Sequence, residues 1–281
     1  MNGAARSFCA ALAATLFWAA AAHAEAPQKV VSMNLCTDQL AMMLAGPGQL
    51  HSVSYIALDP RSSAMVKEAE NFVINHGLAE EIYLMQPDLV IAGAFSTRET
   101  VAMLRRLNIP VVVFDPAYSL SDVADRIAQM GEVLQRSEAA QDLLSDFNAQ
   151  LRELQKTVSD RPSAVLYYAN GYTSGEQSLA GQILSMAGFA NAGAEHGYRS
   201  GMKMPLEVLA LTNPDAVITS RPYPGASRSE DILAHPVVQK MRKTRGTSAI
   251  TDHDWVCGTP FVLRAIETLA RDREKMSGAS P

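Results

Sequence analysis

The hydrophobic and polar pattern contains a stretch of thirteen residues that occurs twice, at 80–92 and at 207–219. Each copy starts with a glutamate, reaches a Pro-Asp pair seven residues later and ends in a Val-Ile run. Because the residue before a proline is disfavoured in a helix, this order predicts a short helix, a turn and a buried strand. The recurrence predicts two similar α/β halves, although such a unit is also common on its own.

The middle of the chain shows only helical periodicity, from residue 121 to 158. One apolar stripe runs from Val123 to Leu134, and a second runs from Leu143 to Leu154. Ser137 is expected to cap the second helix. This helix would be roughly 30 Å long, enough to bridge two domains as a rigid strut. Packing wholly on one domain is the alternative.

The flanking parts predict strands that alternate with helices. Besides the strands of the repeat, buried strands are expected at residues 29–34, 50–54, 109–114, 163–168 and 246–250. Helices are expected at residues 37–44, 99–108, 179–187, 232–241 and 259–271, and a polar loop at 191–204. In open α/β sheets, ligands bind at the carboxyl ends of the strands.

The chain begins with the pattern of a cleavable signal peptide, residues 1–24. Arg6 precedes an apolar run from Phe8 to Ala22, and Ala22-His23-Ala24 fits a cleavage site before Glu25. The run is shorter than the roughly 20 residues that a membrane span needs. We therefore expect export, a periplasmic mature chain, an N-terminal lobe at 25–120, a helical region at 121–160 and a C-terminal lobe at 161–281.

The charge of the chain argues against a nucleic-acid partner, and its cysteine content bears on whether a disulfide forms. A net charge of −5 and a pI near 5.7 give no basic face for nucleic acid. After cleavage, Cys36 and Cys257 remain. In an oxidising compartment they are candidates for a disulfide, and two separate buried thiols are the alternative.

The sequence does not support catalysis. No nucleophile motif or phosphate-binding loop is present, and the histidines are scattered. His253 and Asp254 could bind a metal, but neighbours in sequence rarely face one site, so we expect no metal site. The predicted strand-end loops are instead rich in aromatic, arginine and amide side chains, which suit a planar or chelated anionic ligand. The candidate ligand-binding residues are Asn34, Tyr55, Arg61, Ser96, Arg98, Tyr168, Asn170, Tyr172, Arg199, Arg221 and Trp255, with Tyr167 and Tyr223 nearby.

Over about 250 residues the chain resembles the periplasmic substrate-binding proteins of ABC importers for ferric siderophores, haem or cobalamin. The resemblance is carried by residues 30–34, 80–92 with their echo at 207–219, 107–111, 235–236 and Trp255. It implies two Rossmann-like α/β lobes joined by a single long α-helix, with a ligand cleft between the lobes. It also implies a monomer that docks on a permease dimer of the inner membrane through one glutamate per lobe, here Glu80 and Glu207.

The resemblance leaves several ligands open. Four arginines favour an anionic ferric chelate, so an iron–siderophore complex is the expected ligand, with no cofactor and no metal outside the chelate. Cobalamin is disfavoured by Ile74 and Gly201, where tryptophans would be expected. Haem would need an axial ligand, for which Tyr168, Tyr172 or His76 are possible. A periplasmic chelate-processing enzyme remains a further alternative.

Overall fold

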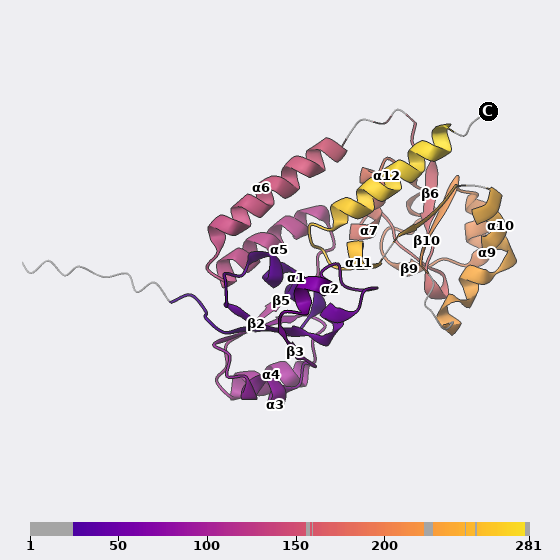
Figure 1. Ribbon diagram of the computed structural model, residues 1–281. Helices are drawn as coiled ribbons and strands as arrows, with labels where there is room; N and C mark the ends of the chain where they lie inside the picture. Colours follow the sequence, from indigo (N-terminus) through magenta and orange to yellow (C-terminus); the bar gives the residue numbers. More distant parts are fainter. Residues whose placement is uncertain are drawn as a thin grey trace, which may run out of the picture.

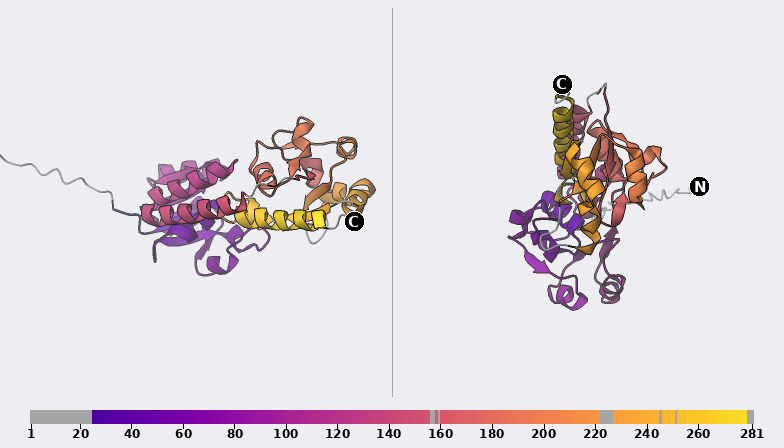
Figure 2. Two further views of the ribbon diagram at one scale, coloured as in Figure 1. Left: turned by 90° about the horizontal axis from the view of Figure 1, so that it is seen from above. Right: turned by 90° about the vertical axis from the view of Figure 1, so that its right-hand side faces the viewer.

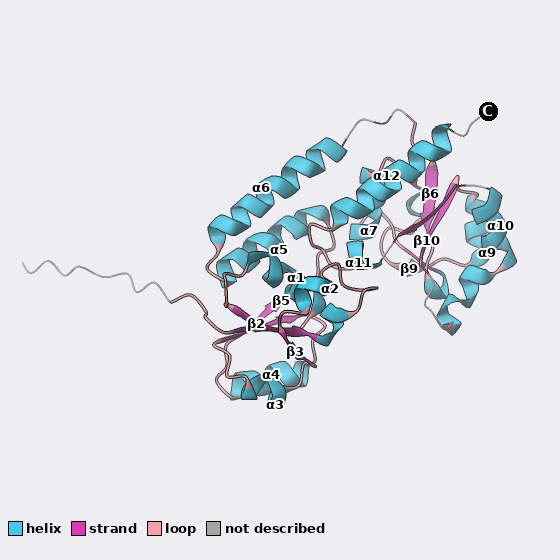
Figure 3. Cartoon of the chain, in the orientation of Figure 1, coloured by secondary structure: helices cyan, strands magenta, loops and turns pink. Residues whose placement is uncertain are grey.

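The computed structural model describes residues 25–155, 158, 160–221, 227–244, 246–250 and 252–278 (Figure 1). The predicted signal peptide, residues 1–24, lies outside the described residues. Two parallel sheets form the centres of two lobes, and helices cover them (Figure 3). No helix in the described part of the chain is both long and apolar enough to cross a membrane.

The N-terminal lobe contains a five-stranded parallel sheet in the order β3-β2-β1-β4-β5. Its strands are β1 (Val30–Ser32), β2 (Leu50–Ser54), β3 (Val73–Asn75), β4 (Leu89–Gly93) and β5 (Val111–Phe114). Its helices are α1 (Leu35–Leu44), η1 (Tyr55–Leu58), α2 (Val66–Ala69), α3 (Ala79–Leu84) and α4 (Arg98–Arg106). Apolar side chains of α3 and α4 pack on one face of the sheet, and α1 packs on the other.

The C-terminal lobe contains a four-stranded parallel sheet in the order β11-β10-β6-β8. Its strands are β6 (Ser163–Leu166), β8 (Ala190–Asn191), β10 (Ala216–Ser220) and β11 (Gly246–Ile250), and β7 (Tyr172–Thr173) pairs antiparallel with β9 (Met202–Lys203). The helices are η2 (Ala169–Gly171), α7 (Leu179–Met186), α8 (Ala192–Glu195), α9 (Leu206–Thr212), η3 (Arg228–Ala234), α10 (Pro236–Thr244), α11 (Asp252–Trp255) and α12 (Val262–Gly278).

The two sheets repeat one strand order, which confirms the two similar halves. In sheet order, β2, β1, β4 and β5 correspond to β8, β6, β10 and β11. The aspartate of the Pro-Asp pair makes equivalent hydrogen bonds in both copies. Asp88 accepts from the backbone N–H groups of Gln28 and Lys29, at 2.6 and 3.0 Å. Asp215 accepts from the backbone N–H and hydroxyl of Ser163, at 2.8 and 2.7 Å. Each aspartate thus ties its own strand to the start of the neighbouring first strand.

A layer of helices joins the lobes. The two helices α5 (Leu120–Val133) and α6 (Ser137–Leu154) pack together, and α6 also contacts α12 from the end of the chain (Figure 2). The predicted stripe on α5 is buried, and Gly131 allows the close approach of α6, because an added Cβ would lie 2.3 Å from Ala140 Cβ. The expected capping role of Ser137 is wrong: Ser137 is the first helical residue, and Arg136 precedes it without a side-chain cap.

One hydrophobic core extends through this layer into both lobes. It includes Val30 and Ile91 of the first sheet and Leu166 and Ile218 of the second. Side chains of α5, α6, α7 and α12 fill the space between them, among them Ile127, Phe147, Ile183 and Ile266. The long helix is therefore part of a packed layer rather than an isolated strut.

Several short elements differ from the sequence prediction. Strand β3 was not predicted, since it is an edge strand whose Val73 is exposed. The predicted polar loop at 191–204 contains α8 and β9. The predicted helix at 232–241 is wrong at its start, because His235-Pro236 separates η3 from α10. The final helix starts three residues later than expected and continues through Gly278.

Candidate functional site

The carboxyl edge of the first sheet gathers predicted site residues from separate strands. Asn34 follows β1, Tyr55 and Arg61 follow β2, and Ser96 and Arg98 follow β4. Because all strands of this sheet are parallel, their carboxyl ends lie along one edge.

The second sheet gathers the remaining predicted residues in the same way. Tyr168, Asn170 and Tyr172 follow β6, Arg221 follows β10 and Trp255 follows β11. Arg199 lies in the loop after α8, and its backbone carbonyl accepts a hydrogen bond from the Gln177 N–H at 2.8 Å. Tyr223 lies outside the described residues.

Two contacts bring these edges together. Cys36, at the start of α1, forms a disulfide with Cys257, which follows α11, with a Cα–Cα distance of 5.0 Å. The Arg61 guanidinium donates from Nη2 to the backbone carbonyl of Arg221, at 3.4 Å. We call the surface formed by the two carboxyl edges the interlobe face. The disulfide, open from sequence alone, is confirmed.

Aromatic rings lie on both sides of the interlobe face. On the C-terminal side, the rings of Tyr168 and Trp255 have centroids 5.3 Å apart, and Trp255 is half-buried. On the N-terminal side, Tyr55 stacks on His76 with centroids 5.5 Å apart and an interplanar angle of 19°. Tyr55 and Tyr172 are exposed, so their rings are open to a ligand.

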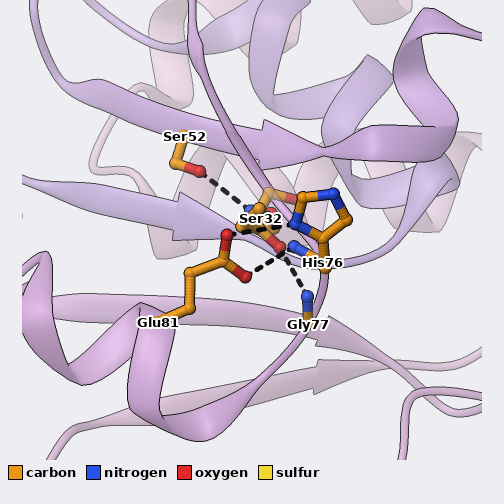
Figure 4. A network of polar contacts seen from close by, with 6 residues as sticks. Ser32, Ser52, His76, Gly77 and Glu81 are labelled. Carbon is orange, nitrogen blue, oxygen red and sulfur yellow. Dashed lines mark hydrogen bonds and ion pairs between the residues drawn. The ribbon is translucent and has the colours of Figure 1, made fainter.

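His76 is held by a polar network at the end of β3 (Figure 4). The Glu81 carboxylate accepts from the His76 backbone N–H at 2.7 Å and contacts its ring Nδ1 at 3.2 Å. The buried Asn75 amide donates to the Ser32 carbonyl and to the Ser52 hydroxyl, both at 2.8 Å. The turn that carries the imidazole is thus anchored on both sides.

A second polar group, Asp38 on α1, is buried beneath the interlobe face. One of its carboxylate oxygens accepts from the Ser54 backbone N–H at 3.1 Å and from the Ser54 hydroxyl at 2.5 Å. Burial raises the pKa of Asp38 to about 7, although these hydrogen bonds act in the opposite direction. Asp38 therefore links α1 to the residue before Tyr55.

Two predicted ligand contacts have clear structural roles. Asn34 is the N-cap of α1, and its side-chain oxygen accepts from the Cys36 N–H at 3.1 Å. Its amide also packs where a side chain on Gly93 would lie, 2.7 Å from the position of an added Cβ. Ser96 accepts from the Gly93 N–H at 3.1 Å and closes the turn after β4. Arg98, Asn170, Arg199 and Arg221 are exposed.

The predicted docking residues occupy matching places on the two lobes. Glu80 on α3 and Glu207 on α9 are both exposed. One helical turn later, each helix exposes a leucine: Leu84 is 80% exposed and Leu211 is 82% exposed. Sequence reasoning did not single out the leucines, although their equal position in the repeat is visible.

No metal cage is present within the described ranges, where no three His, Cys, Asp or Glu side chains gather. His253 contacts its neighbour Asp254 at 3.5 Å, and Arg264 also lies 3.9 Å from that carboxylate. Sequence reasoning named His76 only as a possible haem ligand; it missed Glu81 as the partner of His76, and it missed Asp38. No sequence pattern links Glu81 to His76, because their contact depends on the conformation of the turn between them.

Comparison with known proteins shows which family and which solved structures the chain is similar to. Residues 30–252 match a family model described as periplasmic binding protein. Two curated relatives, from two strains of Halobacterium salinarum and both named cobalamin-binding protein, are 25% identical over 234 residues, 79% of this chain and 61% of theirs. The chain thus spans about three-fifths of the length of these relatives.

Solved structures share the fold at low identity. The periplasmic heme-binding protein RhuT from Roseiflexus sp. RS-1 has a TM-score of 0.72 at 19% identity, covering 89% of this chain and 99% of its own. The vitamin B12 binding protein BtuF of Vibrio cholerae has a TM-score of 0.64 at 18% identity, with coverages of 89% and 98%. A protein of the Fe3+-hydroxamate transport system from Saccharomonospora viridis has a TM-score of 0.67 at 19% identity, with coverages of 88% and 93%.

Proposed function

The chain belongs to the periplasmic binding protein family, and from this premise we propose that it is the receptor of an ABC importer for an iron–siderophore type of metal chelate. The family and the similar proteins are binding proteins rather than enzymes. The periplasm is the expected location, reached through the signal peptide at residues 1–24. The receptor acts as a monomer, and the only metal is the one inside the bound chelate.

The observation that carries the proposal is that Arg61 of the first lobe and Arg221 of the second lie in contact at the interlobe face. Arg61 reaches from the first lobe to the backbone of Arg221 in the second. Guanidinium groups bind carboxylate and other anionic oxygens in a fixed fork, and nearby Tyr and Trp rings offer flat apolar area. A ferric chelate with anionic donor groups matches both properties.

Cobalamin is the second candidate, because the two curated relatives carry that name. Haem is the third, since RhuT of the same fold is named for heme. For cobalamin, the flat rings of Tyr55 and Trp255 on opposite lobes would be the main contacts.

The bound ligand is passed to a permease dimer through the twin lobes. Glu80 and Glu207 would pair with basic side chains of the permease. Leu84 and Leu211 would add an apolar contact beside each ion pair. Covering a leucine this exposed removes apolar surface from water, which stabilises the complex. The equal placement on two similar lobes suits a partner that is itself two-fold.

Fluorescence titration of the chain from Glu25 onward tests the ligand. Trp255 is the only tryptophan after Trp18 in the signal peptide, and it lies beside Tyr168 at the interlobe face. Ferric hydroxamates, ferric catecholates, ferric citrate, hemin and cobalamin form the panel. Saturable quenching by one ferric chelate supports the proposal; saturation by cobalamin or hemin alone supports the alternatives, and the absence of any saturable ligand contradicts the receptor function.

A further inference from the structure

His76 presents an imidazole whose orientation is set by its surroundings. A carboxylate can only accept hydrogen bonds, so the contact between Glu81 and the ring at 3.2 Å places the ring proton on Nδ1. In the neutral imidazole the lone pair then lies on Nε2, for which the described residues provide no hydrogen-bond partner. The imidazole is therefore prepared to donate an electron pair.

This arrangement is the one that metal-bound histidines use. A histidine that binds a metal generally donates its other ring N–H to a carboxylate or carbonyl, which fixes the ring and raises its basicity. Here Tyr55 also stacks on the ring. The Glu81 carboxylate accepts from the His76 backbone N–H, and the Asn75 side-chain oxygen accepts from the N–H of the next residue, Gly77. The His76 side chain is nevertheless 62% exposed.

Stability alone does not account for this network. A hydrogen bond between an exposed His and a Glu contributes little to folding, typically below about 1 kcal/mol. Bonding to the backbone N–H of residue 76 would suffice to tie the turn to α3, without any fixed ring. The ring lies at the carboxyl end of β3, and the carboxyl ends of the strands are where α/β sheets generally bind ligands.

We propose that His76 coordinates the metal of the bound ligand through Nε2. This inference rests on the proposed receptor function and refines it, because it requires a metal complex with an open or exchangeable coordination position. Ferric chelates with fewer than six donor atoms, hemin and aquocobalamin all have such a position. A hexadentate ferric siderophore does not.

The test uses the chain from Glu25 onward with four probes: a ferric bis-catecholate, hemin, aquocobalamin and, as the saturated control, ferrioxamine B. Binding is followed by Trp255 fluorescence, and metal ligation by the visible absorption spectrum of each complex. His76→Ala removes the donor, and Glu81→Gln keeps the side-chain shape while weakening the ring contact. His235→Ala is the matched control, because His235 is also exposed and also has a hydrogen bond at Nδ1.

We expect one unsaturated probe to bind the wild type with a spectrum of nitrogen ligation that His76→Ala lacks. Its affinity should fall tenfold or more in His76→Ala and about tenfold in Glu81→Gln, as for other residues that support a metal ligand. Added imidazole should restore the spectrum of His76→Ala, and His235→Ala should bind like the wild type.

An unchanged spectrum and affinity in His76→Ala, or a preference for ferrioxamine B, would overturn the inference while leaving the receptor function intact. Failure of the wild type to bind any probe would overturn both. Thermal unfolding of each variant separates loss of the fold from loss of the ligand atom, since only loss of the fold lowers the melting temperature substantially.

Discussion

Replacing both cysteines with serine, C36S/C257S, should lower the stability of the whole molecule. The disulfide closes a loop with a sequence separation of 221. In the chain-entropy model, a loop of this length restricts the unfolded chain by about 5 kcal/mol at 25 °C. Native disulfides usually contribute less, so we expect a loss of about 2–5 kcal/mol.

This loss converts into a measurable change in melting temperature. For a chain of this size, 1 kcal/mol corresponds to about 2–4 °C, which predicts a decrease of at least about 4 °C in the melting temperature. Because Cys36 belongs to the first lobe and Cys257 to the second, the loss should affect both lobes rather than one. The remaining common core should keep the unfolding a single transition.

Thermal unfolding monitored by circular dichroism measures the effect. Wild type treated with dithiothreitol should melt like the double variant, and the reductant should not change the double variant. A difference below about 2 °C between wild type and double variant would refute the reasoning, because the cross-link would then not restrict the unfolded chain.

Three further predictions concern single positions. In the wild type, Asp38 keeps its proton when folded and releases it when unfolded between pH 4 and about 7, so stability should fall by up to about 4 kcal/mol as the pH rises through this window. Asp38→Asn should remove that dependence in urea titrations at pH 5 and 8; an equal slope in the variant would contradict the role of Asp38. Gly258→Ala places a Cβ 2.1 Å from Ala117 Cβ and should cost about 1–3 kcal/mol in urea unfolding, whereas Gly201→Ala, with open space around it, should change little; equal effects would argue against the close contact. Glu80→Ala with Glu207→Ala should abolish uptake by cells while leaving ligand quenching of Trp255 unchanged, and a loss of quenching would place these glutamates at the ligand instead.

The main fold was predictable because its signals are long and repeated. Strand β2 and strand β11 have the predicted bounds, and both copies of the repeat form the expected helix and strand. The short strands β3 and β8 were not predictable, because two or three residues carry no periodicity and depend on pairing with a neighbour. Their formation is a tertiary effect.

The candidate site was predictable in residue type but not in role. The cysteines could be identified as a possible pair, but the bond requires that α1 and the segment after α11 meet in space. Asn34 was expected at the ligand, and its additional role as the cap of α1 was not foreseen. His76 had no marked partner, because Glu81 reaches it only through the left-handed turn at Gly77.

Because of the common hydrophobic core, the two lobes are not expected to fold as separate proteins. Its residues come from both sheets and from helices at both ends of the chain, so neither lobe alone can bury its apolar surface. Separate expression of the halves is therefore expected to yield insoluble fragments. A chain cut by a protease between residues 155 and 160 after folding should behave differently: one fragment carries Cys36 and the other Cys257, and the two pieces should migrate together until a reductant is added.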